Sequence, residues 1–379
     1  MTGVQTCALP ISVLRASSMR FSGDIASTAD ADVHIITVPT PVTEENVPDL
    51  EPLRKACRAV GPILKKGAIV VVESTVYPGV TEDICGPLLE EVSGMVSGTD
   101  FYLGYSPERI NPGDKVHTVD KIIKVVAGQN DQVTDILENI YGAATTGGTF
   151  RAKSIKTAEA AKVIENAQRD INIAFVNEAT MIFQKMGISA YDVLETAATK
   201  WNFLNFTPGL VGGHCIGIDP FYLAHRASEV GHEPDLILTG RRINESMGKF
   251  IADSVNAQLK GTSRILVLGI TFKENVPDLR NTKVRDIITG LEELGHQVDV
   301  HDPLADKAEA QQFLDIDLKE NLNNLSGYDA VVGAVAHSVY RDLPTAALED
   351  MLKPGGLIAD VKAIWRGRVF SENIKRWQL

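Results

Sequence analysis

Two short apolar stretches decide the fold of the first part of the chain: VHIITV at residues 33–38 and AIVVV at residues 68–72. Both are nearly continuous and rich in β-branched residues, which is typical of strands buried on both faces of a parallel sheet. The segment between them, 50–64, has a helical composition. The sequence therefore predicts a βαβ unit, with a ligand site at the carboxyl ends of its strands.

Side chains that can bind a ligand follow each predicted strand. Thr40 follows the first strand, and Ser74 and Thr75 follow the second, where they are placed to contact a cofactor or substrate. Capping of turns by these hydroxyls is the alternative that the residues alone leave open. A third strand, 101–105, leads to Glu108, a carboxylate suited to general acid/base work unless it forms a solvated pair with Arg109.

One long helix is predicted from Ser154 to Met186. Its apolar residues follow helical spacing on one stripe, and Gly187 ends it: Ile164, Ile171, Phe175, Ile182. Lys162 and Asn166 are four residues apart, so both project from one face. A surface pair is the ordinary alternative for these two.

The second half of the chain predicts another doubly wound unit. A strand at 264–269 is followed by a helix at about 282–294, and the further strands are 298–301, 328–332 and 357–360. This unit lacks the second and third glycines of the dinucleotide fingerprint, so a pyrophosphate cannot bind as in NAD domains. A helix is expected after Gly240-Arg241-Arg242-Ile243-Asn244, and the polar linker 260–263 marks a domain boundary.

The stretch TPGLVGGHCIGIDP at residues 207–220 is the main candidate for chemistry. It places Cys215 between His214 and Asp219 in a loop with four glycines in nine residues, which indicates positive φ angles and close approach of a ligand. Titratable neighbours favour the thiolate, which is the nucleophilic form. A small buried residue in a tight turn is the alternative.

Composition narrows the class of protein. The chain has 379 residues, with 37 basic and 49 acidic side chains and a net charge of −12, which argues against a general nucleic-acid or membrane-surface binder. No apolar run approaches the roughly 20 residues of a transmembrane helix. Four cysteines, at 7, 57, 85 and 215, show neither metal nor disulfide spacing. We therefore expect a cytoplasmic enzyme without a metal site.

The motif GGHCIGIDP at 212–220 resembles the active-site loop of the UDP-glucose/GDP-mannose dehydrogenase family. The run KWNFL at 200–204, continuing through PGLV at 208–211, resembles the branch of Vi-polysaccharide type that acts on UDP-N-acetylhexosamines. This resemblance implies NAD-dependent, four-electron oxidation of the C6 alcohol of UDP-GlcNAc or UDP-GalNAc to the uronate, through a thiohemiacetal and a thioester on Cys215. It also implies a homodimer or higher homo-oligomer and supply of capsule or O-antigen precursors.

The resemblance also implies roles for individual residues. Lys162 and Asn166 would stabilise oxyanions, Asp219 and Thr75 would hold the attacking water, and Glu108 would assist hydrolysis. Thr40, Ser74 and Thr75 would contact the cofactor. The implied substrate-binding residues are Glu108, Arg109, Asn111, Lys162, Asn166, Arg241, Lys273 and Lys362, with Arg241 contributed from the same chain or across the dimer. Lys273 belongs to a motif that includes Asp278 and Arg280, which could instead form a structural ion pair.

The beginning of the sequence departs from the family pattern. Residues 1–11 resemble a translated sequencing adapter, and no G-x-G-x-x-G precedes Val33. We therefore predict an α/β protein with two doubly wound Rossmann-like domains joined by a long central helix, the first lacking its N-terminal βαβ. The expected division is an artefact (1–11), a remnant of the NAD-binding domain (12–150), a central helical and catalytic-loop domain (151–260) and a UDP-sugar-binding domain (261–379).

Two further hypotheses stay open at this point. The first is a two-electron dehydrogenase of the hydroxyacid or 6-phosphogluconate type, which needs no cysteine. The second is a catalytically inactive UDP-sugar-binding fragment, since a chain without the dinucleotide fingerprint is expected to bind NAD poorly or not at all. The hexosamine epimer is not decided by the sequence, because one hydroxyl's orientation depends on several loops.

Overall fold

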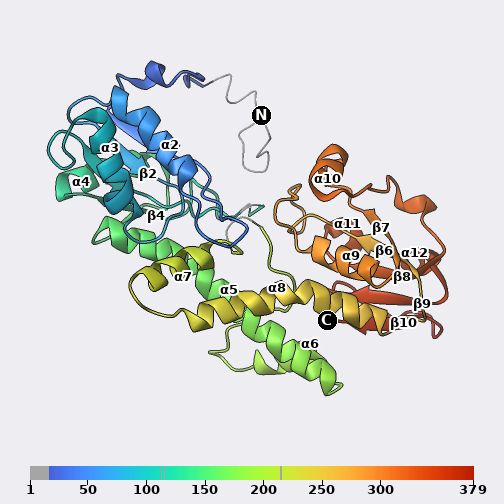
Figure 1. Ribbon diagram of the computed structural model, residues 1–379. Helices are drawn as coiled ribbons and strands as arrows, with labels where there is room; N and C mark the ends of the chain where they lie inside the picture. The colour runs from blue at the N-terminus through green and yellow to red at the C-terminus, as the bar shows by residue number, and fades with distance from the viewer. Residues whose placement is uncertain (1–16, 112, 115, 214–215) are drawn as a thin grey trace. The chain divides into compact units, whose positions relative to one another are not determined.

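The computed structural model describes residues 17–111, 113–114, 116–213 and 216–379 (Figure 1). The predictions for residues 1–11, His214 and Cys215 lie outside the described residues. The chain divides into two compact units, each formed by two segments. The first unit comprises the chain up to residue 168 together with 218–237, and the second comprises 169–217 together with 238–379.

The first unit contains a five-stranded sheet in the order β1-β2-β3-β4-β5, parallel except where β3 meets β4. Its strands are β1 (Val33–Ile36), β2 (Ile69–Val72), β3 (Tyr102–Tyr105), β4 (Lys124–Gly128) and β5 (Thr149–Arg151). Between β1 and β2 the chain forms α2 (Glu51–Val60) and the 3-10 turn η2 (Gly61–Ile63). The predicted βαβ unit is thus confirmed, whereas β4 and β5 had not been predicted.

The prediction that both strands are buried on two faces holds for β2 and is wrong for β1. All four residues of β2 are buried. In β1 burial alternates, and Ile35 is 44% exposed. The reason is that β1 lies at the edge of the sheet and has only one neighbouring strand.

Five further elements belong to the first unit (Figure 1). They are η1 (Ile25–Thr28), the π-helix η3 (Val80–Cys85), α3 (Gly86–Ser93), α4 (Asp131–Ala144) and α7 (Asp219–Glu229). One core joins α2, α3 and η3 to the sheet, and it also includes Ile155, Ala158 and Val163 of the helix that follows β5.

That helix, α5 (Ile155–Lys185), confirms the predicted long helix, and Gly187 follows it with a φ of +70°. The boundary between the two units falls within α5, after Gln168. It is followed by α6 (Ala190–Ala197) and, after α7, by α8 (Asp235–Asn256). The predicted start of α8 after Gly240 is wrong. Gly240 lies inside the helix, where a Cβ would be at an ordinary contact distance of 3.5 Å from Ile171.

The second unit contains a fully parallel five-stranded sheet in the order β10-β9-β8-β6-β7. From β6 onward, the elements of this unit are β6 (Arg264–Leu268), α9 (Val284–Glu293), β7 (Gln297–His301), α10 (Lys307–Leu314), η4 (Leu322–Asn324), β8 (Tyr328–Gly333), α11 (Ser338–Arg341), α12 (Thr345–Asp350), β9 (Leu352–Asp360) and β10 (Lys375–Gln378). Ile265 and Val267 of β6 enter one core cluster, whereas Leu266 and Leu268 enter another. Both faces are therefore covered, as predicted for a doubly wound unit.

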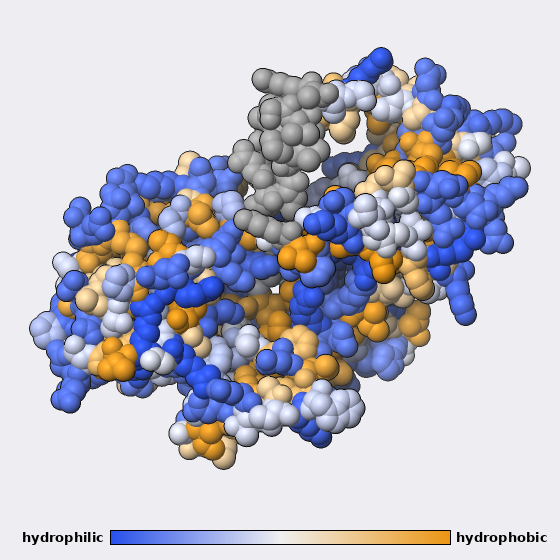
Figure 2. All heavy atoms as spheres, turned by 180° about the vertical axis from the view of Figure 1, so that it is seen from behind, coloured by the Kyte–Doolittle hydropathy of each residue, from blue (hydrophilic) through white to orange (hydrophobic). Residues whose placement is uncertain are grey.

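The surface combines both kinds of side chain. On the face drawn in Figure 2, hydrophobic residues form several separate groups among hydrophilic ones. Across the described residues, no helix has both the length and the apolar character that crossing a bilayer would require.

Candidate active site

Three buried polar side chains of the first unit meet at one point: Lys162, Asn166 and Asp219. The Asn166 amide donates a hydrogen bond of 2.5 Å to Asp219 Oδ2, and Lys162 Nζ lies 3.8 Å from the same oxygen. Lys162 and Asn166 lie one turn apart on α5, as their spacing predicts, and Asp219 is the first residue of α7. Residues more than 50 positions apart in the sequence thus form one cluster.

The environment of Asp219 sets its charge. Burial raises the pKa of this carboxyl to about 6, against the opposing effects of the Lys162 ammonium and the Asn166 amide. Asp219 therefore changes its protonation state near neutral pH, as a group that accepts and returns a proton should. Lys162 and Asn166 are donors fixed on a rigid helix, an arrangement suited to stabilising an oxygen that gains negative charge.

Glu108 and Arg109 lie in the segment that follows β3. The Glu108 carboxylate is half-buried and accepts the backbone N–H of Ile110 at 2.6 Å. Arg109 does not pair with Glu108 in the described structure. Its guanidinium instead contacts Glu165 of α5 at 2.7 Å and the Ile123 carbonyl at 3.3 Å. The ion pair brings this segment to α5, three residues after Lys162. Asn111, the third predicted residue of this segment, is exposed.

The hydroxyl groups predicted to contact a cofactor lie at the carboxyl ends of β1 and β2. Ser74 is buried, and its hydroxyl donates to the Val38 carbonyl at 2.6 Å, which is the turn-stabilising role left open by the sequence. Thr75 is half-buried, and no described residue hydrogen-bonds its hydroxyl. Thr40 precedes Pro41, whose carbonyl accepts the Tyr222 hydroxyl at 3.0 Å. Half-buried hydroxyls at this edge of a parallel sheet fit a nicotinamide dinucleotide.

Two asparagines hold the glycine-rich loop in the second unit. Asn177 of α5 donates to the Gly209 carbonyl at 3.0 Å and accepts the Gly209 N–H at 2.8 Å. The backbone carbonyl of Asn281 accepts the Gly213 N–H at 3.2 Å, and its side-chain amide donates to the Gly213 carbonyl at 3.0 Å. Gly209 and Gly213 have φ angles of +145° and +87°, so the predicted positive φ is confirmed at these two glycines.

A cavity of about 320 Å³ lies beside this loop. It is lined by Arg169, Ile173, Asn205, Phe206, Thr207, Gly209, Leu210 and Lys362. Lys362 approaches the loop so closely that a Cβ on Gly209 would lie 2.9 Å from its Nζ. Burial lowers the pKa of Lys362, against the effect of Glu274. Arg169 and Lys362 give the cavity two cationic groups, which suits a diphosphate.

Lys273 lies in a loop after β6 that a buried histidine supports. His337 Nδ1 accepts the Asn275 N–H at 2.9 Å, and its Nε2 lies 3.1 Å from Asp302 Oδ2. Asp278 and Arg280 of the same loop form the ion pair that the sequence left open, with a shortest distance of 2.6 Å.

Arg241 lies inside α8 and is almost completely buried within the second unit. Its NH1 group contacts Asp170 Oδ1 at 2.7 Å, and its NH2 group contacts Glu245 at 3.3 Å. Its role in substrate binding across a dimer stays a prediction.

Sequence reasoning missed several polar residues beside these clusters. Lys124 of β4 is buried 3.5 Å from Glu73, which also accepts the Tyr141 hydroxyl at 2.5 Å. Glu159 of α5 is fully buried and accepts two backbone N–H groups. Only the place of Glu159 on the helical face of Lys162 and Asn166 could have indicated it. Arg169 belongs to no sequence motif that would have indicated a ligand site.

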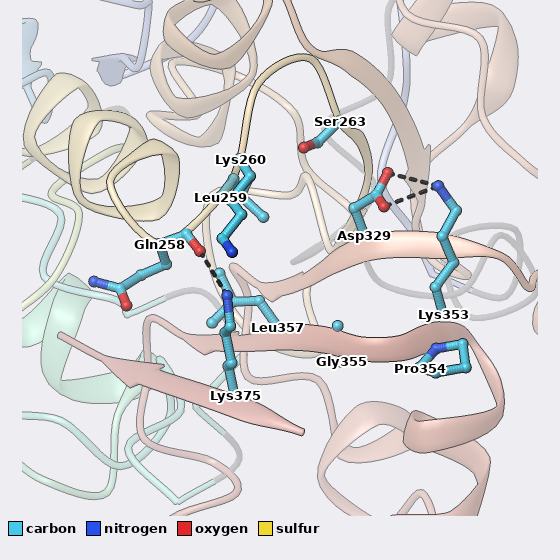
Figure 3. A pocket seen from close by; sticks show the side chains of 11 residues that line it. Gln258, Leu259, Lys260, Ser263, Asp329, Lys353, Pro354, Gly355, Leu357 and Lys375 are labelled. Atoms are coloured by element: carbon cyan, nitrogen blue, oxygen red, sulfur yellow. Dashed lines mark hydrogen bonds and ion pairs between the residues drawn. The ribbon is translucent and has the colours of Figure 1, made fainter. Parts of the chain in front are cut away.

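A second cavity, of about 190 Å³, lies near the amino ends of strands in the second sheet (Figure 3). Figure 3 shows two separate contacts in it. Lys353 pairs with Asp329 at 2.8 Å, and Lys375 donates to the Gln258 carbonyl at 3.3 Å. It lies at the opposite strand ends from the Lys273 loop and shares no residue with the clusters above.

The chain has two α/β units and a long helix whose ammonium and amide groups contact a buried carboxylate. These are the features of the class of two-domain α/β dehydrogenases. Sequence models of three successive domains identify one family within this class. The NAD binding domain of the UDP-glucose/GDP-mannose dehydrogenase family matches residues 9–145, its central domain matches 156–246, and its UDP binding domain matches 266–367. The chain belongs to the UDP-glucose/GDP-mannose dehydrogenase family.

Individual relatives agree with this assignment. Protein CapL of Staphylococcus aureus is 49% identical over 97% of this chain and 87% of its own length. The UDP-N-acetyl-D-glucosamine 6-dehydrogenase of Pseudomonas aeruginosa is 47% identical over 92% of this chain and 83% of its own. Among solved structures, the UDP-D-ManNAc dehydrogenase of Pyrococcus horikoshii superposes with a TM-score of 0.86 at 28% identity, covering 96% of this chain and 85% of that one.

These comparisons do not support the predicted truncation of the first domain, since the NAD binding domain matches residues 9–145. They do support the family that the loop at 212–220 had indicated and NAD as its cofactor.

Proposed function

We propose that the chain is an NAD-dependent UDP-N-acetylglucosamine 6-dehydrogenase that oxidises the C6 alcohol to the carboxylate. The buried cluster of Lys162, Asn166 and Asp219 is the observation that carries this proposal, because it supplies two donors and one titrating carboxylate. The choice of GlcNAc rests on the name of the Pseudomonas aeruginosa relative.

Each residue of the proposed site has its own role in the reaction. NAD, when bound, would accept one hydride from C6, and two NAD molecules in succession would take the two hydrides that the oxidation releases. Asp219 takes the proton of the alcohol, while Lys162 and Asn166 stabilise the oxygen as its charge changes. The Cys215 thiol adds to the aldehyde carbon, which keeps the intermediate bound until it becomes a thioester. Thr75 and Glu108 position the water that cleaves the thioester, releasing the uronate and the free thiol.

The second unit would bind the nucleotide part of the substrate. The match of the UDP binding domain to residues 266–367 supports this assignment, and so do the cations of Arg169 and Lys362 beside one cavity. Lys273 would add a third cation, and Arg109 and Asn111 would contact the hexosamine. We further propose a cytoplasmic homodimer that supplies a capsule or O-antigen precursor.

The stoichiometry of NADH tests this function. We expect two NADH per UDP-GlcNAc consumed. The Cys215→Ser variant should form no uronate. The Cys57→Ser variant, which removes a buried thiol outside the cluster of Lys162, Asn166 and Asp219, should turn over like the wild type. One NADH per substrate would favour the two-electron alternative. Calorimetry that detects binding of UDP-GlcNAc but not of NAD would favour the inactive fragment. UDP-GalNAc assayed in parallel decides the epimer.

A further inference from the structure

Glu159 is a buried carboxylate to which the scheme above gives no role. It lies on α5, one turn before Lys162, and has no exposed surface. Its Oε2 accepts the N–H of Gly79 at 2.6 Å, and its Oε1 accepts the N–H of Thr81 at 2.9 Å. Gly79 directly precedes η3, and Thr81 is the second residue of η3. The two carboxylate oxygens thus tie α5 to a backbone about 80 positions earlier in the sequence.

The start of η3 explains why this segment needs a carboxylate. Backbone N–H groups in the first turn of a helix have no partner within the helix. Gly79 precedes η3 with a φ of +106°, and a Cβ there would lie 2.6 Å from Asp83 Oδ2. The conformation that only glycine adopts easily therefore directs the N–H groups of Gly79 and Thr81 toward α5. An anionic acceptor at a helix N-terminus satisfies both groups at once.

The anchored segment carries Thr75. Before it, the Ser74 hydroxyl donates to the Val38 carbonyl at 2.6 Å. After it, the Tyr77 ring packs against Tyr222 and His225 of α7, with ring centroids 6.2 and 5.3 Å away. The backbone on both sides of Thr75 is therefore held, whereas no described residue hydrogen-bonds the Thr75 hydroxyl.

We propose that Glu159 is a positioning residue. Its carboxylate fixes residues 74–81 and thereby keeps Thr75 at a constant position relative to Lys162, Asn166 and Asp219. Glu159, Lys162 and Asn166 are spaced three and four residues apart, so they share one face of α5. One rigid helix thereby sets the position of the Thr75 segment and of the Asp219 cluster together. The catalytic part of this inference rests on the proposed function.

The charge of Glu159 gives the contact a pH dependence. Burial raises the pKa of this carboxyl to about 7, and the hydrogen bonds from residues 79 and 81 oppose that rise. Of the groups facing it, Glu82 of η3 raises the pKa further. Tyr105 of β3 and Cys85 of η3 stay neutral near pH 7, because burial raises the pKa of Tyr105 and a contact with Cys57 raises that of Cys85. Glu159 is therefore ionised, and binds the two amides most strongly, above pH 7.

The contribution of Glu159 to the stability of the fold depends on pH in the opposite direction. Because the folded-state pKa of Glu159 is raised, its contribution to stability is present below about pH 4.5 and is lost as the pH rises through about 7. A glutamine would avoid that loss, but its NH2 group would oppose one of the two amide donors.

Hydrogen exchange and kinetics of Glu159→Gln test the proposal, with Glu91→Gln, an exposed position on α3 of the same unit, as the matched control. In the ligand-free chain at pH 8, we expect residues 76–85 to exchange at least about tenfold faster in Glu159→Gln and to be unchanged in the control. The kcat for UDP-GlcNAc should fall about tenfold or more, with KM changed less than about threefold.

The outcomes separate the two proposals. Unchanged exchange in Glu159→Gln overturns the anchor, and faster exchange with wild-type kcat overturns the positioning role. A wild type without turnover contradicts the proposed function, while the exchange result still decides the anchor. If Glu159→Gln does not fold, Glu159→Asp replaces it: the shorter carboxylate should keep one amide contact and give intermediate exchange, and wild-type exchange would overturn the anchor.

Discussion

Two buried acids with raised pKa values lie on or beside the same face of α5. The pKa of Asp219 is about 6 and that of Glu159 about 7, and burial is the main cause for both. They differ in their partners, because Asp219 contacts an ammonium and a side-chain amide whereas Glu159 accepts hydrogen bonds from two backbone amides. Asp219 is thus suited to exchange protons with a substrate, and Glu159 to hold a segment of backbone.

Asn166→Ala should move the pH profile of the enzyme. The Asn166 amide lowers the pKa of Asp219, so its removal should raise that pKa above about 6. If ionised Asp219 accepts the alcohol proton, the acid limb of kcat/KM shifts to higher pH, and the plateau falls about 100-fold with the lost oxyanion donor. Rates measured from pH 5 to 9 check this, with Asn139→Ala on the exposed face of α4 as control. An acid limb that stays in place would contradict the assignment.

Spacing made part of this site predictable. A separation of four residues placed Lys162 and Asn166 on one helical face, and the family resemblance singled them out together with Asp219. Glu159, Lys124 and the His337 contact with Asp302 could not be found in the same way. Each depends on residues that only the sheet topology brings together, such as Gly79 and Glu159.

At the scale of elements, α5 organises both units. Its first part enters the core of the first unit through Ile155, Ala158 and Val163. Its second part enters the second unit, where Asn177 holds Gly209 and Asp170 meets Arg241. A helix of 31 residues with no internal proline is stiff enough to serve as a common support.

Asn177→Leu should loosen the glycine-rich loop. The substitution keeps the volume but leaves the Gly209 N–H and carbonyl without partners in the interior, which costs at least about 2 kcal/mol of unfolding free energy. It should also weaken binding of UDP-GlcNAc, because Gly209 lines the cavity with Lys362. Thermal unfolding and calorimetry check both effects, and Asn139→Leu is the control. Wild-type affinity together with a lowered Tm would separate the loop from the binding site.

The elements themselves were partly predictable. Continuous β-branched runs identified β2 and β6, whose residues enter cores on both faces. The short strand β5 and the edge strand β10 were missed, because their residues are largely exposed and lack a buried pattern. The start of α8 was placed too late, after residues 240–244, whereas the helix begins at Asp235.

At the scale of the whole molecule, the apolar stripe of α5 remains to be explained. Ile164, Phe175 and Ile182 are 59%, 69% and 52% exposed in the single chain. They recur at helical spacing along one element, whereas isolated exposed apolar residues need no explanation. This α5 stripe supports the proposed homodimer, in which two copies of the helix would cover each other's apolar side chains.

Phe175→Asp should therefore convert the dimer to a monomer. A carboxylate in the middle of the α5 stripe would be buried without a partner in the dimer but solvated in the monomer, so association should weaken by at least about 100-fold. Light scattering during size-exclusion chromatography measures the mass, which should fall from about twice to once 41.1 kDa. Val369→Asp places the same charge at a site outside α5 that is 88% exposed, so it should leave the mass unchanged. A wild-type chain that is monomeric at all concentrations, or a Phe175→Asp variant that stays dimeric, would exclude the stripe as the interface.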